Sequence, residues 1–236
     1  MANHKMQMSG VQITWLGHAT FKITSPQGKI ILIDPWTQGN PACPDQHKNI
    51  DHVDIMLVSH GHFDHVGDAI SIATATKPTC VAIVELAGWL ESKGVQNTIG
   101  MNKGGTVDVQ GIKISMTHAI HTSSVNDSVY VGESCGFVVE FENGVKMYHA
   151  GDTNVFGDMA IIRELYAPEI VMLPMGDLFT MGPREAAYAI NLLKPKTVIP
   201  MHFGTFPVLT GTPAELKKLA PDVEVLEMKP GVTIGG

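Results

Sequence analysis

Short β-branched segments and helix-like segments follow one another in an order that the chain runs through twice: a meander of strands, then strands and helices in turn. Gly17-His18 and Pro26-Gln27-Gly28 separate the first strands, as turn residues do in hairpins. The apolar run 53–58 is short enough for a buried strand. The strands expected in this first passage are 11–15, 20–24, 29–33, 53–58 and 79–84, and the helices are 68–76 and 85–93.

The second passage follows the same order without detectable sequence repetition. Asn143-Gly144 is a strong hairpin signal between two of its strands. Its expected strands are 106–109, 112–117, 136–141, 145–149, 170–173, 197–200 and 223–226, and its helices are 156–165, 183–193 and 213–219. Two stacked mixed sheets with helices on both outer faces would bury all of these strands. The sequence therefore predicts an α/β (α+β) fold, built as a four-layer αββα sandwich.

The composition fits one folded domain. Of 236 residues, 44% are hydrophobic and only 17% are charged, so the chain can bury a sizeable core. No linker, low-complexity segment or charge run divides it. We expect a flexible N-terminal segment at 1–10 and a single domain at 11–236.

Charge and cysteine content argue against several classes of protein. A net charge of -7 does not suit a chain that gains its affinity by neutralising nucleic-acid phosphates. Cys43, Cys80 and Cys135 are widely spaced, which indicates neither a disulfide framework nor a thiolate zinc site. The first residues lack the apolar stretch of a signal peptide, and no apolar run reaches the roughly 18 residues of a membrane span. We expect a cytoplasmic protein with no membrane span and no nucleic-acid partner.

The run His60-Gly61-His62-Phe63-Asp64-His65 carries three imidazoles and a carboxylate directly after the apolar strand 53–58. Few structural needs explain that density, and imidazole and carboxylate ligands suit zinc, iron or manganese. In a loop that leaves a strand, His60 and His62 can face one point while Asp64 and His65 turn towards a second. The run therefore predicts a metal site with room for two ions.

Each metal needs further ligands, because catalytic zinc commonly has three protein ligands and an open position for water. Candidates stand at the ends of later strands, where a sheet edge gathers them: either His118 or His121, then Asp152, then His202. His149 alternates differently along its strand and is expected either to be packed inside the protein or to contact a ligand rather than a metal.

Taken together, these motifs resemble the metallo-β-lactamase superfamily of hydrolases, in which an H-x-H-x-D-H run is followed by a separate His, then Asp, then His. More narrowly, the chain resembles the UPF0173 metal-dependent hydrolases over residues 11–231. The segments that carry this resemblance are Gly17-His18-Ala19-Thr20, Asp34-Pro35, His149-Ala150-Gly151-Asp152-Thr153, Phe179-Thr180-Met181-Gly182-Pro183 and Pro200-Met201-His202-Phe203.

The resemblance implies two divalent metal ions, with Zn²⁺ expected and Mn²⁺ or Fe²⁺ as alternatives. The implied ligands are His60, His62 and His121 for the first ion, Asp64, His65 and His202 for the second, and Asp152 as the bridge. His121 is preferred to His118 because His121-Thr122-Ser123 resembles the family's His-Ser-Ser segment. A metal-bridging hydroxide, oriented by Asp64 as the catalytic residue, would cleave an ester-type bond of a small molecule, a lactone or a phosphodiester by preference.

Three residues are weaker candidates for supporting the ligands or lining the site. His18 stands in a tight turn, and turn geometry alone is the alternative. Asp34 can accept a hydrogen bond from a ligand histidine, although Asp-Pro also opens ordinary turns. Asp177 can reach substrate near the start of the helix 183–193, or serve only to cap it.

Two other functions share parts of this pattern. A tRNA-processing nuclease has the same ligands but needs a basic RNA-binding arm, which 16 scattered Lys and Arg residues do not provide. A non-hydrolytic iron-binding redox protein would replace a first-site histidine by a carboxylate, whereas His62 is retained. A small-molecule substrate is the expected partner, and the sequence leaves a homo-oligomer open.

Overall fold

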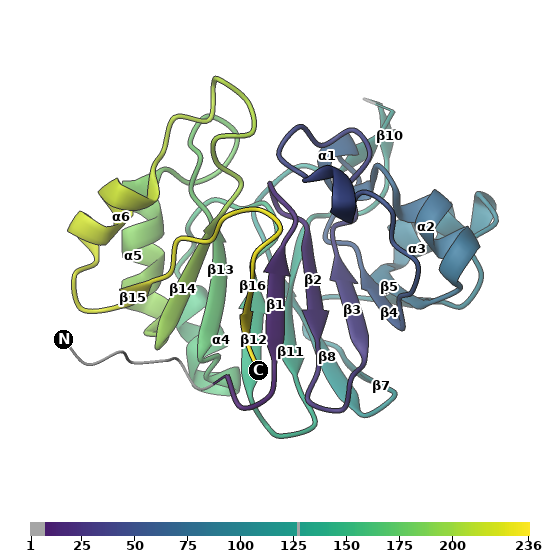
Figure 1. Ribbon diagram of the computed structural model, residues 1–236, viewed down its shortest axis with the longest axis horizontal. Helices are drawn as coiled ribbons and strands as arrows, with labels where there is room; N and C mark the ends of the chain where they lie inside the picture. The colour runs from purple at the N-terminus through teal and green to yellow at the C-terminus, as the bar shows by residue number, and fades with distance from the viewer. Residues whose placement is uncertain (1–7, 127) are drawn as a thin grey trace.

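The computed structural model describes residues 8–126 and 128–236, in which two mixed seven-stranded sheets lie face to face (Figure 1). The first sheet has the order β16-β1-β2-β3-β4-β5-β6. Its strands are β1 (Gln12–Trp15), β2 (Phe21–Thr24), β3 (Ile30–Ile33), β4 (Ile55–Leu57), β5 (Thr79–Ile83), β6 (Thr98–Met101) and β16 (Thr233–Gly235). Strands β3 to β6 run parallel to one another, so their carboxyl ends meet at one edge.

The second sheet has the order β15-β14-β13-β12-β11-β8-β7. Its strands are β7 (Thr106–Val109), β8 (Ile112–His118), β11 (Cys135–Glu140), β12 (Lys146–His149), β13 (Ile170–Pro174), β14 (Thr197–Met201) and β15 (Glu224–Val225). Strands β12 to β15 are parallel. A separate two-stranded sheet is formed by β9 (Ser124–Val125) and β10 (Val129–Tyr130).

Residues of the second sheet alternate between two apolar layers, which explains why its strands are almost continuously hydrophobic. Phe137 and Val139 of β11 belong to the core that the two sheets share, whereas Val138 faces the other way. In β12, likewise, Met147 lies in the shared core and Tyr148 in the outer layer. Both faces of this sheet are therefore buried, one by the other sheet and one by helices.

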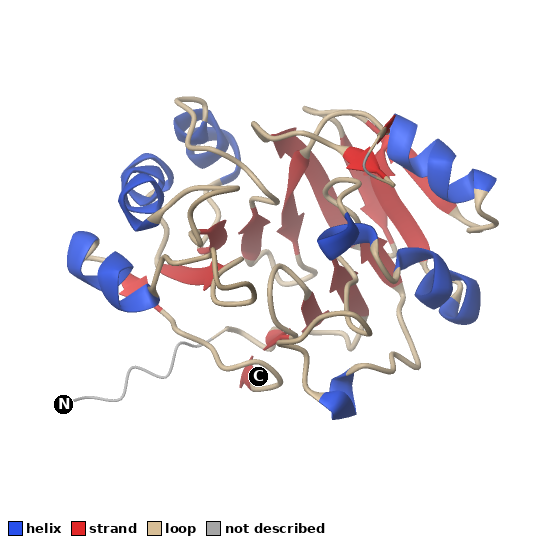
Figure 2. Ribbon diagram, turned by 90° about the horizontal axis from the view of Figure 1, so that it is seen from above, coloured by secondary structure: helices blue, strands red, loops and turns tan. Residues whose placement is uncertain are grey.

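Helices flank the sheets on their outer sides, as the view from above shows (Figure 2). The helices are α1 (Phe63–Val66), α2 (Ala69–Thr76), α3 (Val84–Ser92), α4 (Met159–Tyr166), α5 (Pro183–Leu193) and α6 (Pro213–Leu219), with a short 3-10 turn at Asp45–His47. The outer layer of the second sheet includes Met159 of α4, Ile190 of α5 and Leu216 of α6. The predicted sandwich of two mixed sheets and flanking helices is confirmed. Across the described part of the chain, no helix combines the length and apolar character that crossing a membrane requires.

The structure differs locally from the sequence prediction in the run from His60 to His65 and at the N-terminus. The run from His60 to His65 is not all loop, because α1 begins at Phe63. Residues 1–7 of the predicted flexible segment lie outside the described residues, whereas Met8 is 3% exposed and packs in the shared core. The packed part of the chain thus begins before the predicted boundary.

Candidate metal centre

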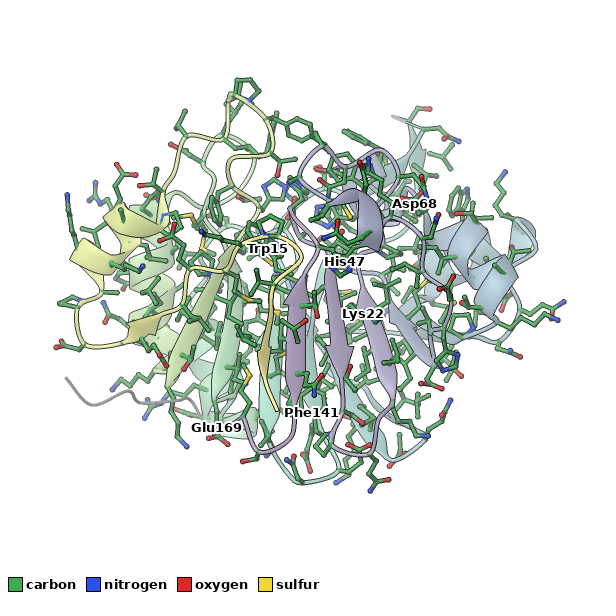
Figure 3. All side chains as sticks on the ribbon, viewed as in Figure 1. Trp15, Lys22, His47, Asp68, Phe141 and Glu169 are labelled. Carbon is green, nitrogen blue, oxygen red and sulfur yellow. The ribbon has the colours of Figure 1, made fainter. Side chains whose placement is uncertain are left out.

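The predicted ligands come from loops and the short helix α1 at one end of the two sheets. His60 and His62 lie between β4 and α1, and Asp64 and His65 lie in α1 itself. His121 follows β8, Asp152 follows β12 and His202 follows β14. Trp15 and Asp68 lie towards this end of the molecule, and Phe141 and Glu169 lie at the opposite end (Figure 3). The carboxyl ends of the parallel strands thus gather side chains that are far apart in the sequence.

A first group of donor atoms consists of three imidazoles. The Nδ1 atom of His62 lies 3.1 Å from Nε2 of His60 and 3.3 Å from Nε2 of His121. All three residues can place one nitrogen within 4.8 Å of the others. His60 is buried, and His62 and His121 are half-buried, so this group opens towards solvent.

A second group combines a carboxylate with imidazoles. Oδ2 of Asp64 lies 3.7 Å from Nε2 of His202 and 3.9 Å from Nε2 of His65. His18 joins this group, with Nε2 2.9 Å from the same oxygen. One donor atom from each of these four residues lies within 4.8 Å of the rest.

Asp152 stands between the two groups. Its Oδ2 atom lies 3.0 Å from Nε2 of His202 and 3.3 Å from Nε2 of His65. The same oxygen is 3.6 Å from Nε2 of His121 and 3.9 Å from Nε2 of His60. A single carboxylate oxygen therefore faces imidazoles of both groups, the position that a bridging ligand needs.

Asp34 fixes the orientation of two histidines. Its Oδ1 accepts from the backbone N–H of Ser59 at 2.7 Å, and its Oδ2 accepts from Nδ1 of His65 at 2.8 Å and from the Ser59 hydroxyl at 2.7 Å. Because the Ser59 proton goes to the carboxylate, the Ser59 oxygen is free to accept from Nδ1–H of His60 at 3.0 Å. With a cation bound, both Nε2 atoms would present a lone pair to it, as metal-ligating histidines do. Asp34 is thus more than a turn opener.

Burial and neighbouring charges perturb the pKa values of the cluster strongly. Burial lowers the pKa of His60 well below its usual value and that of His18 to about 4. Burial also works against the charged form of His202, but its contacts with the carboxylates of Asp152 and Asp64 together outweigh burial and raise the pKa of His202 to about 9. The carboxylates of Asp152, Asp34 and Asp64 likewise outweigh burial and hold the pKa of His65 well above its usual value. Without a metal, protons on His65 and His202 compensate the buried carboxylates.

The donor set fits a divalent cation. Within the described residues, three buried polar atoms of the cluster have no hydrogen-bond partner: Nε2 of His65, Oδ1 of Asp152 and Nδ1 of His202. Buried polar atoms are usually paired, because an unpaired one costs about 1–3 kcal/mol. Nε2 of His65 is also the atom that faces Asp152 and Asp64. A cation at this point would pair it and take over the charge compensation.

Two of the sequence candidates lie outside the cluster. His118 is exposed, and its Nδ1 lies 3.2 Å from Nζ of Lys103. Asp177 is exposed as well, and its Oδ1 accepts from the backbone N–H of Leu178. His149 is fully buried with Nε2 on the carbonyl of Ala19, which is the packed position expected of it.

Sequence reasoning missed two polar residues that support the cluster. Ser59 precedes His60 directly, and its place beside a ligand candidate was the only signal. Thr205 holds Nδ1 of His18 at 3.0 Å from its hydroxyl, across 187 residues of chain. No local sequence pattern predicts a contact between residues so far apart in the chain.

Fold and donor set together define a metal-dependent hydrolase of the metallo-β-lactamase type. A β-lactamase superfamily domain model matches residues 12–202. The chain is 56% identical over 231 residues to a UPF0173 metal-dependent hydrolase of Koribacter versatilis, covering 97% of this chain and 99% of that one. It is 48% identical over 233 residues to a UPF0173 metal-dependent hydrolase of Methanosarcina barkeri, covering 96% and 99% of the two chains.

A solved structure gives the same result. Igni18, a metallo hydrolase from Ignicoccus hospitalis, superposes with a TM-score of 0.85 at 36% sequence identity, covering 95% of this chain and 97% of that one. The chain therefore belongs to the UPF0173 family of metal-dependent hydrolases.

Proposed function

We propose that the cluster holds two divalent metal ions and that the protein hydrolyses an ester-type bond of a small molecule, a lactone or a phosphodiester by preference. His60, His62 and His121 would hold the first ion, Asp64, His65 and His202 the second, and Asp152 both. The observation that carries this assignment is the position of Asp152 Oδ2, which lies 3.0–3.9 Å from imidazole nitrogens of both groups. Zn²⁺ is the expected ion, with Mn²⁺ or Fe²⁺ as alternatives.

When bound, a pair of such ions supplies a hydroxide nucleophile at neutral pH and stabilises the negative charge that develops on the substrate. The residues of the chain supply position and proton handling. Asp34 and Ser59 hold the rings of His65 and His60, so that these ligands do not have to reorganise during turnover. Asp64, the most exposed carboxylate of the cluster at 13%, would orient the attacking water and carry its proton to the leaving group.

Substrate reaches the site from the side of the first group, where His62 and His121 are half-buried. Phe63 follows His62 in the sequence and is exposed. Its ring packs edge-on against that of Trp36, with 5.7 Å between the ring centroids. An exposed aromatic ring therefore lies next to the donors, which suits contact with a small organic molecule. The domain organisation is proposed on a separate ground: the core shared by the two sheets supports a single domain at residues 11–236. A cytoplasmic location stays a prediction from the sequence.

The experiment that tests the function combines metal analysis with a substrate panel. Purified protein is expected to contain two equivalents of zinc or manganese and to hydrolyse chromogenic phosphodiesters or lactones, with activity lost on chelation and restored by the metal. Thioester and β-lactam substrates serve as comparison classes. One metal per chain, or turnover that survives complete removal of metal, would contradict the proposal.

A further inference from the structure

His18 belongs to the cluster by geometry, yet the ligand scheme gives it no task. Its side chain is fully buried, with Nε2 2.9 Å from Oδ2 of Asp64 and Nδ1 3.0 Å from Oγ1 of Thr205. Its ring lies 3.9 Å from the ring of His202 between centroids. It stands nearer to Asp64 than either of the imidazoles proposed to share a metal with that carboxylate.

The backbone holds His18 in place at some cost. Gly17 and His18 both have a positive φ, +96° and +57°, a conformation that residues other than glycine seldom adopt. Such strain persists only where the surroundings fix it, and it is common at functional sites. Here the carbonyl of His18 accepts from Nε1 of Trp15 at 2.9 Å and from the backbone N–H of His202 at 3.0 Å. The turn is thereby tied to the segment that carries a ligand candidate.

The hydrogen bonds also assign the ring proton. A carboxylate only accepts, so Nε2–H of His18 donates to Asp64. Nδ1 of a neutral ring must then accept, and the Thr205 hydroxyl is the donor within reach. The contacts form one directed chain, from the Thr205 hydroxyl through His18 to the oxygen of Asp64 that faces His65 and His202.

We propose that His18 is a positioning residue: held by Thr205, it orients Asp64 and so sets the affinity of the second metal. This inference rests on the proposed function, because it assumes that Asp64 is a ligand of that metal. It assigns to the Gly17-His18 turn a task that turn geometry alone does not explain. It also explains why an otherwise unfavourable backbone conformation is maintained next to the cluster.

The test is a calorimetric titration of the metal-free protein with Zn²⁺. His18→Ala should weaken the binding of the second metal, the one that Asp64 would hold, by about 10-fold to 100-fold, the range found when a partner of a ligand is removed. The affinity for the first metal should stay unchanged. His18→Gln retains an N–H that can reach Asp64 and should recover most of that loss. Thr205→Val should lose part of the second affinity, because it frees the ring of His18 to rotate.

His52→Ala is the matched control. His52 also contacts an aspartate, with Nε2 3.2 Å from Oδ1 of Asp54, but it is 65% exposed and outside the cluster. The His52→Ala variant should bind both ions with the affinities of the parent protein. Thermal unfolding of the metal-free variants identifies any that fail to fold, and His18→Gln or Thr205→Val then carries the test in place of His18→Ala.

Two results would overturn the inference. One is an unchanged second affinity in folded His18→Ala. The other is a Co²⁺-saturated His18→Gln whose visible absorption shows a lower coordination number than the parent, since His18 would then be a ligand itself. Neither result bears on turnover. A parent protein that binds only one ion would instead defeat the proposed function, so the two failures are distinguishable.

Discussion

Asp64 differs from the other carboxylates of the cluster in how it is supported. Asp34 is tied by three hydrogen bonds, and Asp152 is surrounded by imidazoles, whereas Asp64 has one short contact, to His18. The nearby His65 charge and the contacts with His18 and His202 outweigh burial and hold the pKa of Asp64 well below its usual value. It is therefore ionised across the neutral range, as a carboxylate that ligates a metal must be.

Asp64→Asn tests this role at the scale of one residue. The amide keeps the size of the side chain but removes its charge, so we expect the fold to persist while turnover falls by at least about 100-fold. The second metal should also bind more weakly, which metal analysis after dialysis measures. Asp45→Asn is the control, because Asp45 is 94% exposed, pairs with Lys48 and is not part of the cluster. An Asp64→Asn variant with two bound metals and full activity would refute the assignment.

The elements that position the site follow from the sequence to different degrees. β11 and β14 could be predicted because Cys135–Glu140 and Thr197–Met201 are short apolar, β-branched runs. β6 could not, because Thr98–Met101 is interrupted by Gly100, whose missing side chain leaves room for Val84 of α3. β16 pairs with β1 from the other end of the chain, and no local pattern encodes such a partner.

The site residues, too, could be predicted from the sequence only in part. The run from His60 to His65 could be recognised by its density of imidazoles and carboxylate, and Asp152 and His202 by their positions at the ends of predicted strands. Local sequence could not predict the long-range contacts, such as Asp34 with His65 or His18 with Thr205. These contacts form only when the two sheets pack together in the folded protein. For the same reason, the sequence left the choice between His118 and His121 to family resemblance. The structure brings His121 to the cluster and leaves His118 on the surface.

Gly176 tests how the loops after β13 and β14 fit together. A Cβ atom there would lie 2.0 Å from the carbonyl oxygen of His202 and 3.2 Å from Cβ of Leu209, so backbone must move. Gly176→Ala should destabilise the fold by about 1–3 kcal/mol, as overpacking does, and lower metal occupancy by displacing His202. Gly88→Ala is the matched control. Gly88 lies exposed inside α3 with no atom near its Cβ position, so this change should stabilise by about 0.4–1 kcal/mol.

Urea unfolding of the two variants in parallel measures both effects. Similar changes in the free energy of unfolding, of the same sign in the two variants, would mean that the loop after β13 can move to accommodate the added Cβ atom. The position of His202 would then not depend on its close approach to Gly176.

At the scale of the whole molecule, the cluster joins the two sheets. His60 and His62 follow β4 of the first sheet, whereas Asp152 and His202 follow β12 and β14 of the second. Contacts such as His65 to Asp152 at 3.3 Å therefore cross from one half of the sandwich to the other. A metal bound here would link both halves, and its affinity for the folded state would add to the stability of the entire fold.

Chelation should accordingly lower the thermal midpoint of unfolding. At a free metal concentration of 100 times Kd, each site contributes about 2.7 kcal/mol to the folded state. For a chain of this size that corresponds to roughly 5–10 °C per site, since each kcal/mol shifts the midpoint by about 2–4 °C. Scanning calorimetry with excess Zn²⁺, and again with a chelator, measures the difference. Asp152→Asn, which loses the carboxylate between the two groups, should respond much less to added metal. Identical midpoints with metal and with chelator in the parent protein would mean that no ion links the two sheets.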